Sequence, residues 1–356
     1  MLPNCDLPGE IMVEILSRLP VKSLIRFRCV CKSWYPLLTN PNFIIMHLNH
    51  SKFSTTNDSH KLVVRLHNRF TYFTVFSLYC GEPLSDSPVD LHIPFTADIY
   101  DLGIVGSCNG LLCVLLEQDT VLWNPATRQF RFLPELECPV WPISMGFGFH
   151  PNTDDYKFVR IASYEDAPLM ITQVEVYTFS SNSWKEIEVA VPGLIFENSS
   201  TASLQNGFLH WMAYGTDREI IVSFDLGDEV FREIAVPDSH GISFEINRKL
   251  SVLKESLSVI VYSTAEEKNI CFDIWVMNEY GVEESWTKQF TVGPLLTVSK
   301  PLGFWKNGEV IFNYEENLNN VLFLYDPSAQ EMKDFLTHGT EYSYEVYNYV
   351  ESLVLI

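Results

Sequence analysis

The histidines and cysteines are the first side chains to consider, because they could bind a metal ion. His47 and His50 lie three residues apart, which places two imidazoles on one face of a helix. Cys29 and Cys31 form a Cys-x-Cys pair. A protein zinc site needs further ligands, and neither pair has any at a suitable spacing. We therefore predict no metal site: the histidines are expected at a solvated helix end and the thiols in apolar packing.

Carboxylates could supply general acids and bases. Adjacent acidic residues occur in several expected turns, as at Asp154-Asp155, Glu266-Glu267, Glu283-Glu284 and Glu315-Glu316. In turns such pairs are usually solvated. The chain has no Gly-x-Ser-x-Gly elbow, phosphate-binding loop or Gly-x-Gly-x-x-Gly motif. The sequence therefore predicts no catalytic residue and no cofactor.

The composition indicates a folded chain with a large core. Of the 356 residues, 47% are hydrophobic and 13% are aromatic. The net charge of −21 argues against binding of nucleic acid through its phosphates. The longest apolar run, Leu111–Leu116, is far shorter than the roughly 20 residues that cross a bilayer, so we expect no membrane partner. Eight cysteines without a disulfide spacing, and the lack of a secretion signal, favour the cytoplasm, the nucleus or both.

The charge is divided unevenly along the chain. Residues 1–50 hold five Lys or Arg against three acidic residues, whereas the rest holds 19 against 42. A small basic module at 1–48, a linker at 49–60 and a large acidic domain at 61–356 are the predicted parts. Partners of opposite charge are expected for the two modules.

The basic module has the pattern of three short helices. Apolar residues at 7, 11, 12, 15, 16 and 19 form a helical stripe that Pro20 ends. A second helix is expected at about 22–28, and a third from about 30, stopped by Asn40-Pro41. Pro36 implies that the third helix kinks or starts later. So small a bundle buries little surface alone, which predicts an apolar face that is left for a partner.

These residues resemble the F-box, particularly its plant form. The matching positions are Leu7-Pro8, Glu14-Ile15-Leu16, Leu19-Pro20, Lys22-Ser23-Leu24, Arg26-Phe27, Val30-Cys31-Lys32, Trp34 and Leu38. The resemblance implies binding to a Skp1-type adaptor, and through it to cullin and RING subunits. The implied contact residues are Leu7, Pro8, Ile11, Ile15, Leu16, Leu19, Pro20, Leu24, Val30, Cys31, Lys32 and Trp34.

Beyond residue 60 the chain repeats a strand, a polar turn and a second strand. In each copy a large apolar residue follows an aromatic one seven places on, or eleven in the copy at Trp275: Trp123 and Phe130, Tyr177 and Trp184, Phe224 and Phe231, Trp275 and Trp286, Tyr325 and Met332. The copies start 54, 47, 51 and 50 residues apart, and a weaker copy lies near Phe76. A period near 50 with several short strands is typical of a β-propeller blade.

We therefore predict a mainly β protein: a small three-helix F-box followed by a β-propeller-like domain of about six blades. Asn-Gly pairs at 109–110, 206–207 and 307–308 predict type I′ hairpin turns. The last residues, 349–356, are expected to be a strand that closes the ring against the first blade. A pair of stacked β-sandwiches is the alternative, because the kelch Gly-Gly and the Trp-Asp of common blades are missing.

A second resemblance covers the chain from about residue 5 to its end. The large domain is similar to the F-box-associated domain of plant F-box/kelch-repeat and S-locus F-box proteins. The positions that carry this resemblance are Gly106 to Leu112, Trp123 to Arg128, Gly146 to Pro151, Asp155-Tyr-Lys157, Val174 to Tyr177 and Tyr349 to Val354.

The resemblance implies that the chain is the substrate-recognition subunit of an SCF (Skp1–cullin–F-box) ubiquitin ligase. The subunit itself is expected not to be an enzyme. The acidic domain predicts a basic protein substrate, and candidate binding loops are 163–170, 213–218, 237–242 and 313–320, although the sequence identifies no substrate-binding residue. The alternatives are an adaptor- or ligand-binding propeller without a ligase role, and a propeller enzyme.

Overall fold

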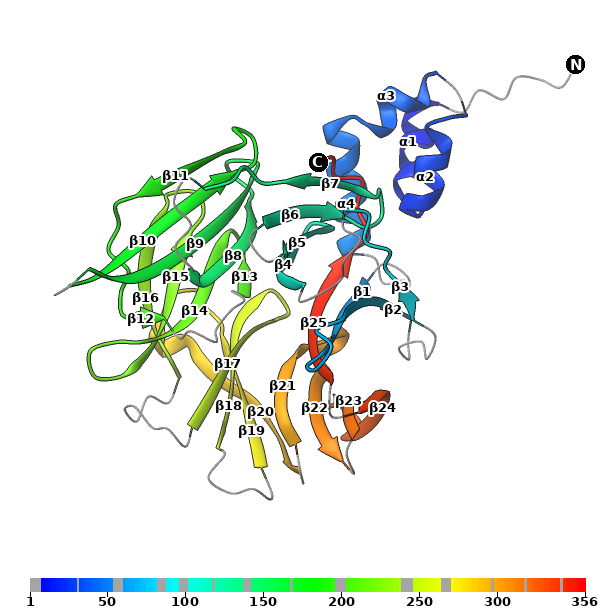
Figure 1. Ribbon diagram of the computed structural model, residues 1–356. Coiled ribbons are helices and arrows are strands. Elements are labelled where there is room, and N and C mark those ends of the chain that lie inside the picture. Colours follow the sequence, from blue (N-terminus) through cyan, green and yellow to red (C-terminus); the bar gives the residue numbers. More distant parts are fainter. Residues whose placement is uncertain are drawn as a thin grey trace, which may run out of the picture.

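The structure is a computed structural model of the chain (Figure 1). It describes residues 8–30, 32–53, 60–81, 88–95, 102–116, 119–136, 142–166, 169–195, 203–237, 246–263, 270–295, 298–316, 319–339 and 342–356. Helices occupy the amino-terminal part and strands the remainder, as the sequence predicts.

The amino-terminal module contains one helix more than expected. Its helices are α1 (Gly9–Ser17), α2 (Val21–Phe27), α3 (Trp34–Leu38) and α4 (Pro41–Phe53). Because α3 begins at Trp34, Pro36 falls in its first turn, where proline is tolerated. Asn40 and Pro41 end α3 and also start α4, since the Asn40 side chain accepts the Asn42 amide at 2.9 Å. Helix α4 therefore continues past residue 48, where the linker was expected to begin.

The strands form six sheets, which we number as blades 1 to 6. Blade 1 contains β25 (Tyr342–Val350), β1 (His60–Asn68), β2 (Thr74–Cys80) and β3 (Val89–Asp90). Blade 2 contains β4 (Gly103–Cys108), β5 (Leu111–Leu116), β6 (Asp119–Asn124) and β7 (Gln129–Phe132). Blade 3 contains β8 (Pro142–His150), β9 (Asp155–Asp166), β10 (Leu169–Thr178) and β11 (Ser183–Ile187).

The second half of the ring repeats this order. Blade 4 contains β12 (Leu194–Ile195), β13 (Ser203–Gln205), β14 (Phe208–Tyr214), β15 (Glu219–Asp225) and β16 (Val230–Ala235). Blade 5 contains β17 (Ile246–Leu253), β18 (Ser256–Ser263), β19 (Ile270–Met277) and β20 (Trp286–Leu295). Blade 6 contains β21 (Val298–Phe304), β22 (Val310–Glu316), β23 (Asn319–Asp326) and β24 (Glu331–Gly339). Two 3₁₀ turns complete the elements, η1 (Glu283–Ser285) and η2 (Lys306–Gly308).

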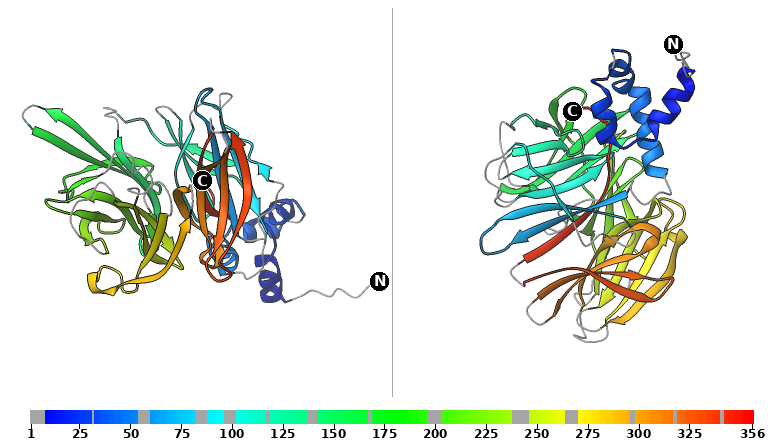
Figure 2. Two further views of the ribbon diagram at one scale, coloured as in Figure 1. Left: turned by 90° about the horizontal axis from the view of Figure 1, so that it is seen from below. Right: turned by 90° about the vertical axis from the view of Figure 1, so that its right-hand side faces the viewer.

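The sheets close into a ring, which Figures 1 and 2 show from three directions. One strand of each blade contacts the corresponding strand of the next, in the order β25, β4, β8, β13, β17, β21 and back to β25. Large apolar clusters fill the spaces between neighbouring blades. The fold is a six-bladed β-propeller, and the β-sandwich alternative is wrong. The expected closing strand at 349–356 is wrong: β25 (Tyr342–Val350), which lies earlier in the chain, closes the ring against β1, and residues 351–356 leave the sheet.

The sequence repeat marks the turn from the third to the fourth strand of a blade. Trp123 pairs directly with Phe130 across β6 and β7, and the corresponding residues of blades 3, 4 and 6 pair in the same way. In blade 5 the expected pair is wrong: Trp275 lies opposite Lys288, and Trp286 lies opposite Met277. The longer turn there contains η1, and the register of β19 with β20 also shifts between Ile274 and Trp275.

Two of the three Asn-Gly pairs form the predicted hairpin turns. Asn109 and Gly110 have φ of 52° and 80°, and the pair at 206–207 is similar. The pair at 307–308 instead lies in η2. Blade 5 makes the equivalent turn with Lys254 and Glu255, both at positive φ, which a search for glycine could not find.

Candidate functional site

The amino-terminal module exposes an apolar surface, which we call the adaptor surface because the resemblance implies adaptor contact there. Ile11 and Ile15, one turn apart on α1, are 49% and 48% exposed, and Val30 after α2 is 63% exposed. The expected contact residues Pro8, Pro20 and Lys32 are also exposed.

Other members of the implied contact set lie inside the module. Leu16 and Leu24 are buried in its core, and Leu19 and Trp34 are partly buried against that core. The Trp34 ring packs on Phe27 with a centroid distance of 5.2 Å. These four residues pack in the core beneath the adaptor surface and hold its exposed side chains in place. Leu7 and Cys31 lie outside the described residues.

Arg28 and Tyr35 were missed by sequence reasoning. Tyr35 is 58% exposed beside the implied set. The Nε and Nη2 atoms of Arg28 are buried and have no hydrogen-bond partner among the described residues. Burial lowers the pKa of the Arg28 guanidinium, and Tyr35 opposes this shift. The guanidinium is only partly enclosed, but two of its nitrogens are buried without an acceptor among the described residues, which is costly.

The predicted histidine pair is divided between two environments. His47 is buried rather than solvated, and its Nε2 atom lies 3.0 Å from the carbonyl oxygen of Leu19. Burial lowers its pKa, which keeps the ring neutral. His50 is half-exposed, with its Nε2 atom 3.9 Å from a carboxylate oxygen of Glu14. His47 is thus a structural link between α4 and the end of α1.

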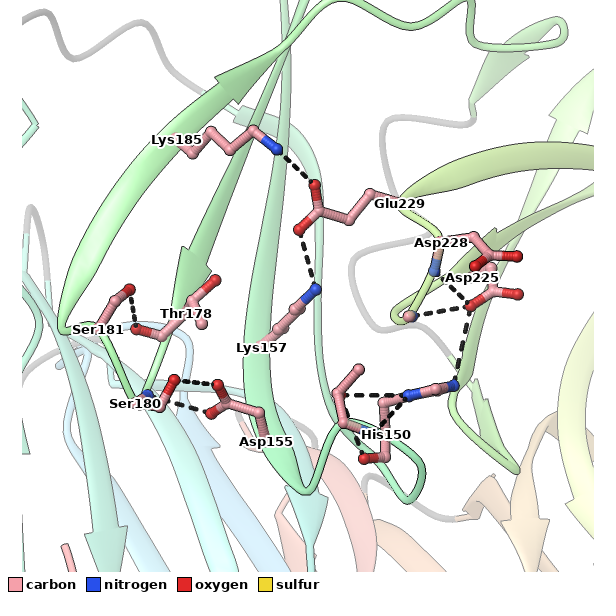
Figure 3. Close-up of polar contacts among 12 residues, drawn as sticks. His150, Asp155, Lys157, Thr178, Ser180, Ser181, Lys185, Asp225, Asp228 and Glu229 are labelled. Carbon is pink, nitrogen blue, oxygen red and sulfur yellow. Dashed lines mark hydrogen bonds and ion pairs between the residues drawn. The ribbon is translucent and has the colours of Figure 1, made fainter.

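Several titratable groups meet where blades 3 and 4 adjoin (Figure 3). Glu229 accepts hydrogen bonds of 2.9 Å from both Lys157 and Lys185. Burial acts to raise the pKa of Glu229, but the two lysines outweigh it and the pKa is lowered. Asp155 accepts the backbone amides of Tyr156 and Ser180 at 2.8 and 3.1 Å. These groups have partners inside the protein and hold neighbouring segments together.

The part of the chain that the structure describes has no metal-binding cluster of three His, Cys, Asp or Glu side chains. Burial raises the pKa of Cys108 to about 12 and that of Cys113 well above its ordinary value, so neither thiol is a ready nucleophile. His210 is buried, with its Nε2 atom 2.8 Å from the Tyr280 hydroxyl, as expected for a structural histidine.

Three of the four candidate substrate loops lie at one end of the propeller. The F-box packs at the other end, where the first strand turns into the second and the third into the fourth; there Ala126 and residues 353–354 contact its core. Turns between the second and third strands therefore point away from the F-box. Stretches 163–170 and 313–320 are the ends of the β9–β10 and β22–β23 hairpins rather than loops, and Figure 2 shows the β9–β10 hairpin reaching out from the ring.

The third stretch also belongs to this end. The β14–β15 turn, within 213–218, is closed by a 2.8 Å hydrogen bond from the Gly215 amide to the Arg218 carbonyl. Of 237–242 only Pro237 lies within the described residues. The F-box and the described candidate loops therefore lie at opposite ends of the propeller.

Comparisons with known proteins agree with this architecture. The family model described as the F-box associated beta propeller domain matches residues 82–356, and the F-box domain matches residues 4–46. F-box protein At3g07870 of Arabidopsis thaliana is 30% identical, over 94% of this chain and 88% of the relative. F-box/kelch-repeat protein At3g23880 of the same plant is 29% identical, over 88% and 86%. F-box protein CPR1 of Arabidopsis thaliana is 28% identical, over 98% and 89%.

A solved structure supports the fold alone. TolB from Acinetobacter baumannii superposes with a TM-score of 0.52 at 10% identity, over 86% of this chain and 72% of that chain. An F-box joined to a six-bladed propeller defines a class of two-module proteins. The chain belongs to the F-box proteins that carry an F-box associated β-propeller domain. No helix in the described ranges is long and apolar enough to span a membrane.

Proposed function

We propose that the chain is the substrate-recognition subunit of an SCF-type ubiquitin ligase. Its F-box binds a Skp1-type adaptor, and its propeller binds a protein that is then ubiquitinated. The observation that carries the proposal is the exposed Ile11, Ile15 and Val30 surface, on a module of the F-box family. Apolar side chains left in water on so small a module are typical of a binding surface.

The adaptor surface combines apolar anchors with one unsatisfied cation. Burial of Ile11 and Ile15 by the adaptor would supply most of the affinity, as aliphatic and aromatic anchors do at interface centres. An acceptor from the adaptor would complete the hydrogen bonds of Arg28 once the side chains that cover its Nε and Nη2 atoms move aside. A hydrogen bond to a charged group that is shielded from water adds specificity as well as energy.

The chain performs no bond chemistry in this proposal. It holds a substrate lysine near the charged ubiquitin-conjugating enzyme, so that an intermolecular transfer gains a high effective concentration. Placement of the two binding regions at opposite ends of the propeller suits this role, since neither partner obstructs the other. Free thiols at Cys29, Cys80 and Cys271 favour a reducing compartment, in the cytoplasm or nucleus.

A basic protein is the proposed substrate class. The chain beyond residue 50 carries 19 Lys or Arg against 42 acidic residues, and such a field attracts positive partners in a salt-dependent way. Substrate affinity that does not change between low and high salt would contradict this part of the proposal.

Reconstitution tests the whole proposal. The full chain, co-expressed with a Skp1-type adaptor, is expected to elute as a stable complex that recruits cullin and RING subunits and supports ubiquitin transfer. A complex with the adaptor that never recruits cullin would favour the alternative of a binding protein outside the ligase. Failure of the folded chain to bind the adaptor would refute the proposal.

A further inference from the structure

The last fifteen residues of the chain contribute to both modules. Strand β25 (Tyr342–Val350) pairs along its length with β1 and so closes the propeller. The chain then leaves the sheet, and residues 351–356, which we call the tail, run to the F-box. Figure 1 shows the carboxyl end beside α4, and α4 also contacts β25.

Blade 2 holds the tail by its backbone. The side-chain amide of Asn124 donates hydrogen bonds to the carbonyl oxygens of Ser352 and Val354, at 3.2 and 2.9 Å. Asn124 is fully buried. Gly110 lies so close that a Cβ there would meet the Ser352 side chain and the Val350 carbonyl. Two neighbouring turns of blade 2 therefore fix the path of the tail.

The F-box holds the tail by a side chain. Leu353 has no exposed surface and is a member of the F-box core, together with Leu16, Leu24, Leu38, Phe43 and Ile44. Val354 packs both on this core and on the apolar cluster between blades 2 and 3. The core of the F-box is thus completed by a residue that lies more than three hundred positions further along the chain.

We propose that the tail is a joint that fixes the F-box at one angle on the propeller. Asn124 holds the tail backbone on blade 2 while Leu353 is inserted into the helical bundle, so the adaptor surface and the substrate-binding end keep a set separation. This joint does not depend on which protein binds the F-box. Its consequence for ubiquitin transfer rests on the proposed function: the angle selects which substrate lysines are modified.

The chain itself supplies a matched pair of variants. Asn124, Asp225 and Asp326 occupy the same position in blades 2, 4 and 6, and each accepts two backbone amides of its own turn through Oδ1. Asn124→Asp keeps this acceptor role but loses the amide that donates to the tail. Asp326→Asn makes the reverse change in a turn that does not contact the tail. The two variants therefore separate the turn from the joint.

Amide hydrogen exchange measures how firmly the tail is held in the full chain, and fluorescence resonance energy transfer measures the angle between the F-box and the propeller. Amides of the tail are expected to exchange at least about tenfold faster in Asn124→Asp, because the tail opens more readily when its carbonyl oxygens lose the two hydrogen bonds from Asn124. In Asp326→Asn they are expected to exchange at the wild-type rate. Dyes on the exposed thiols of Cys29 in the F-box and Cys271 in blade 5 report the angle, after Cys5, Cys31, Cys80 and Cys138 are replaced by serine. The distance distribution is expected to be narrow in wild type and Asp326→Asn and to broaden in Asn124→Asp.

Two outcomes would overturn the inference. One is unchanged tail exchange and a narrow distribution in Asn124→Asp; the other is equal loosening by Asp326→Asn. If Asn124→Asp does not fold, Leu353→Ser is measured instead, since it leaves β25 and the blade 2 turn unaltered, and a narrow distribution there would also overturn the inference. Failure of the wild-type chain to bind a Skp1-type adaptor would refute the proposed function but would not contradict the inference about the joint.

Discussion

Replacement of both Ile11 and Ile15 with alanine is expected to weaken binding of a Skp1-type adaptor while leaving the propeller folded. The two side chains lie one turn apart on α1 and are about half exposed, at 49% and 48%. Alanine preserves helix propensity, so the change removes apolar surface and little else.

The magnitude follows from the exposed fractions. Full burial of an isoleucine side chain stabilises by about 1.5–3 kcal/mol, so the exposed half of each can contribute about 1 kcal/mol on binding. Loss of both contributions, about 2 kcal/mol, raises Kd about 30-fold. The half that is already buried supports the bundle, so the folded module also loses about 1 kcal/mol per substitution.

Titration calorimetry with the purified adaptor, and thermal melts of the free chain, separate the two effects. Ile45→Ala is the matched control, because Ile45 on α4 is 45% exposed but is not among the implied contacts. Leu24→Ala removes a fully buried side chain and is expected to cost about 2–5 kcal/mol of stability. Equal affinities for the double variant and wild type, or an equal loss in Ile45→Ala, would refute the assignment of the adaptor surface.

Three further predictions concern stability. Burial lowers the pKa of His47 below 6.5 in the folded chain. As the pH drops through 6.5 the unfolded chain therefore binds more protons than the folded chain, and the free energy of unfolding is expected to fall. The variant His47→Gln should show a weaker pH dependence in chemical denaturation. Arg248 and Glu219 form a buried ion pair. Glu219→Gln leaves the charge of the guanidinium uncompensated and is expected to destabilise the folded chain by about 3–5 kcal/mol, measured in thermal melts. An unchanged Tm would contradict the pairing. Gly207→Ala would place a Cβ 2.5 Å from the His150 ring, whereas Gly281 has a similar positive φ and nothing within 4 Å; the melt of Gly207→Ala should therefore fall further than that of Gly281→Ala.

Short-range patterns in the sequence predicted the blades well. The aromatic residue and its partner seven places on reflect a turn of fixed length, which sets the register of two strands by local geometry. The same logic failed at Trp275, since a longer turn changes the spacing. It also missed the turn at Lys254 and Glu255, whose conformation normally indicates glycine or asparagine.

The sequence predicted which segment contains the candidate site, but not which of its residues are exposed and which are buried. The helical stripe and the F-box resemblance identified the right segment. They could not separate exposed Ile11 and Ile15 from buried Leu16 and Leu24, because a helix stripe shows which face is apolar and not what covers it. Arg28 gave no signal, since an unpaired guanidinium is recognised only from its surroundings.

By itself, the sequence determined the first three helices of the F-box, the spacing of the blades and the acidic character of the large domain. These properties depend on residues within about one turn or hairpin of each other, or on composition alone. Only the tertiary structure decided that β25 closes the ring, that His47 is buried and that Leu353 completes the F-box core. Those outcomes depend on packing between segments far apart in the chain, and no local pattern of residue types records which distant surface a side chain will meet.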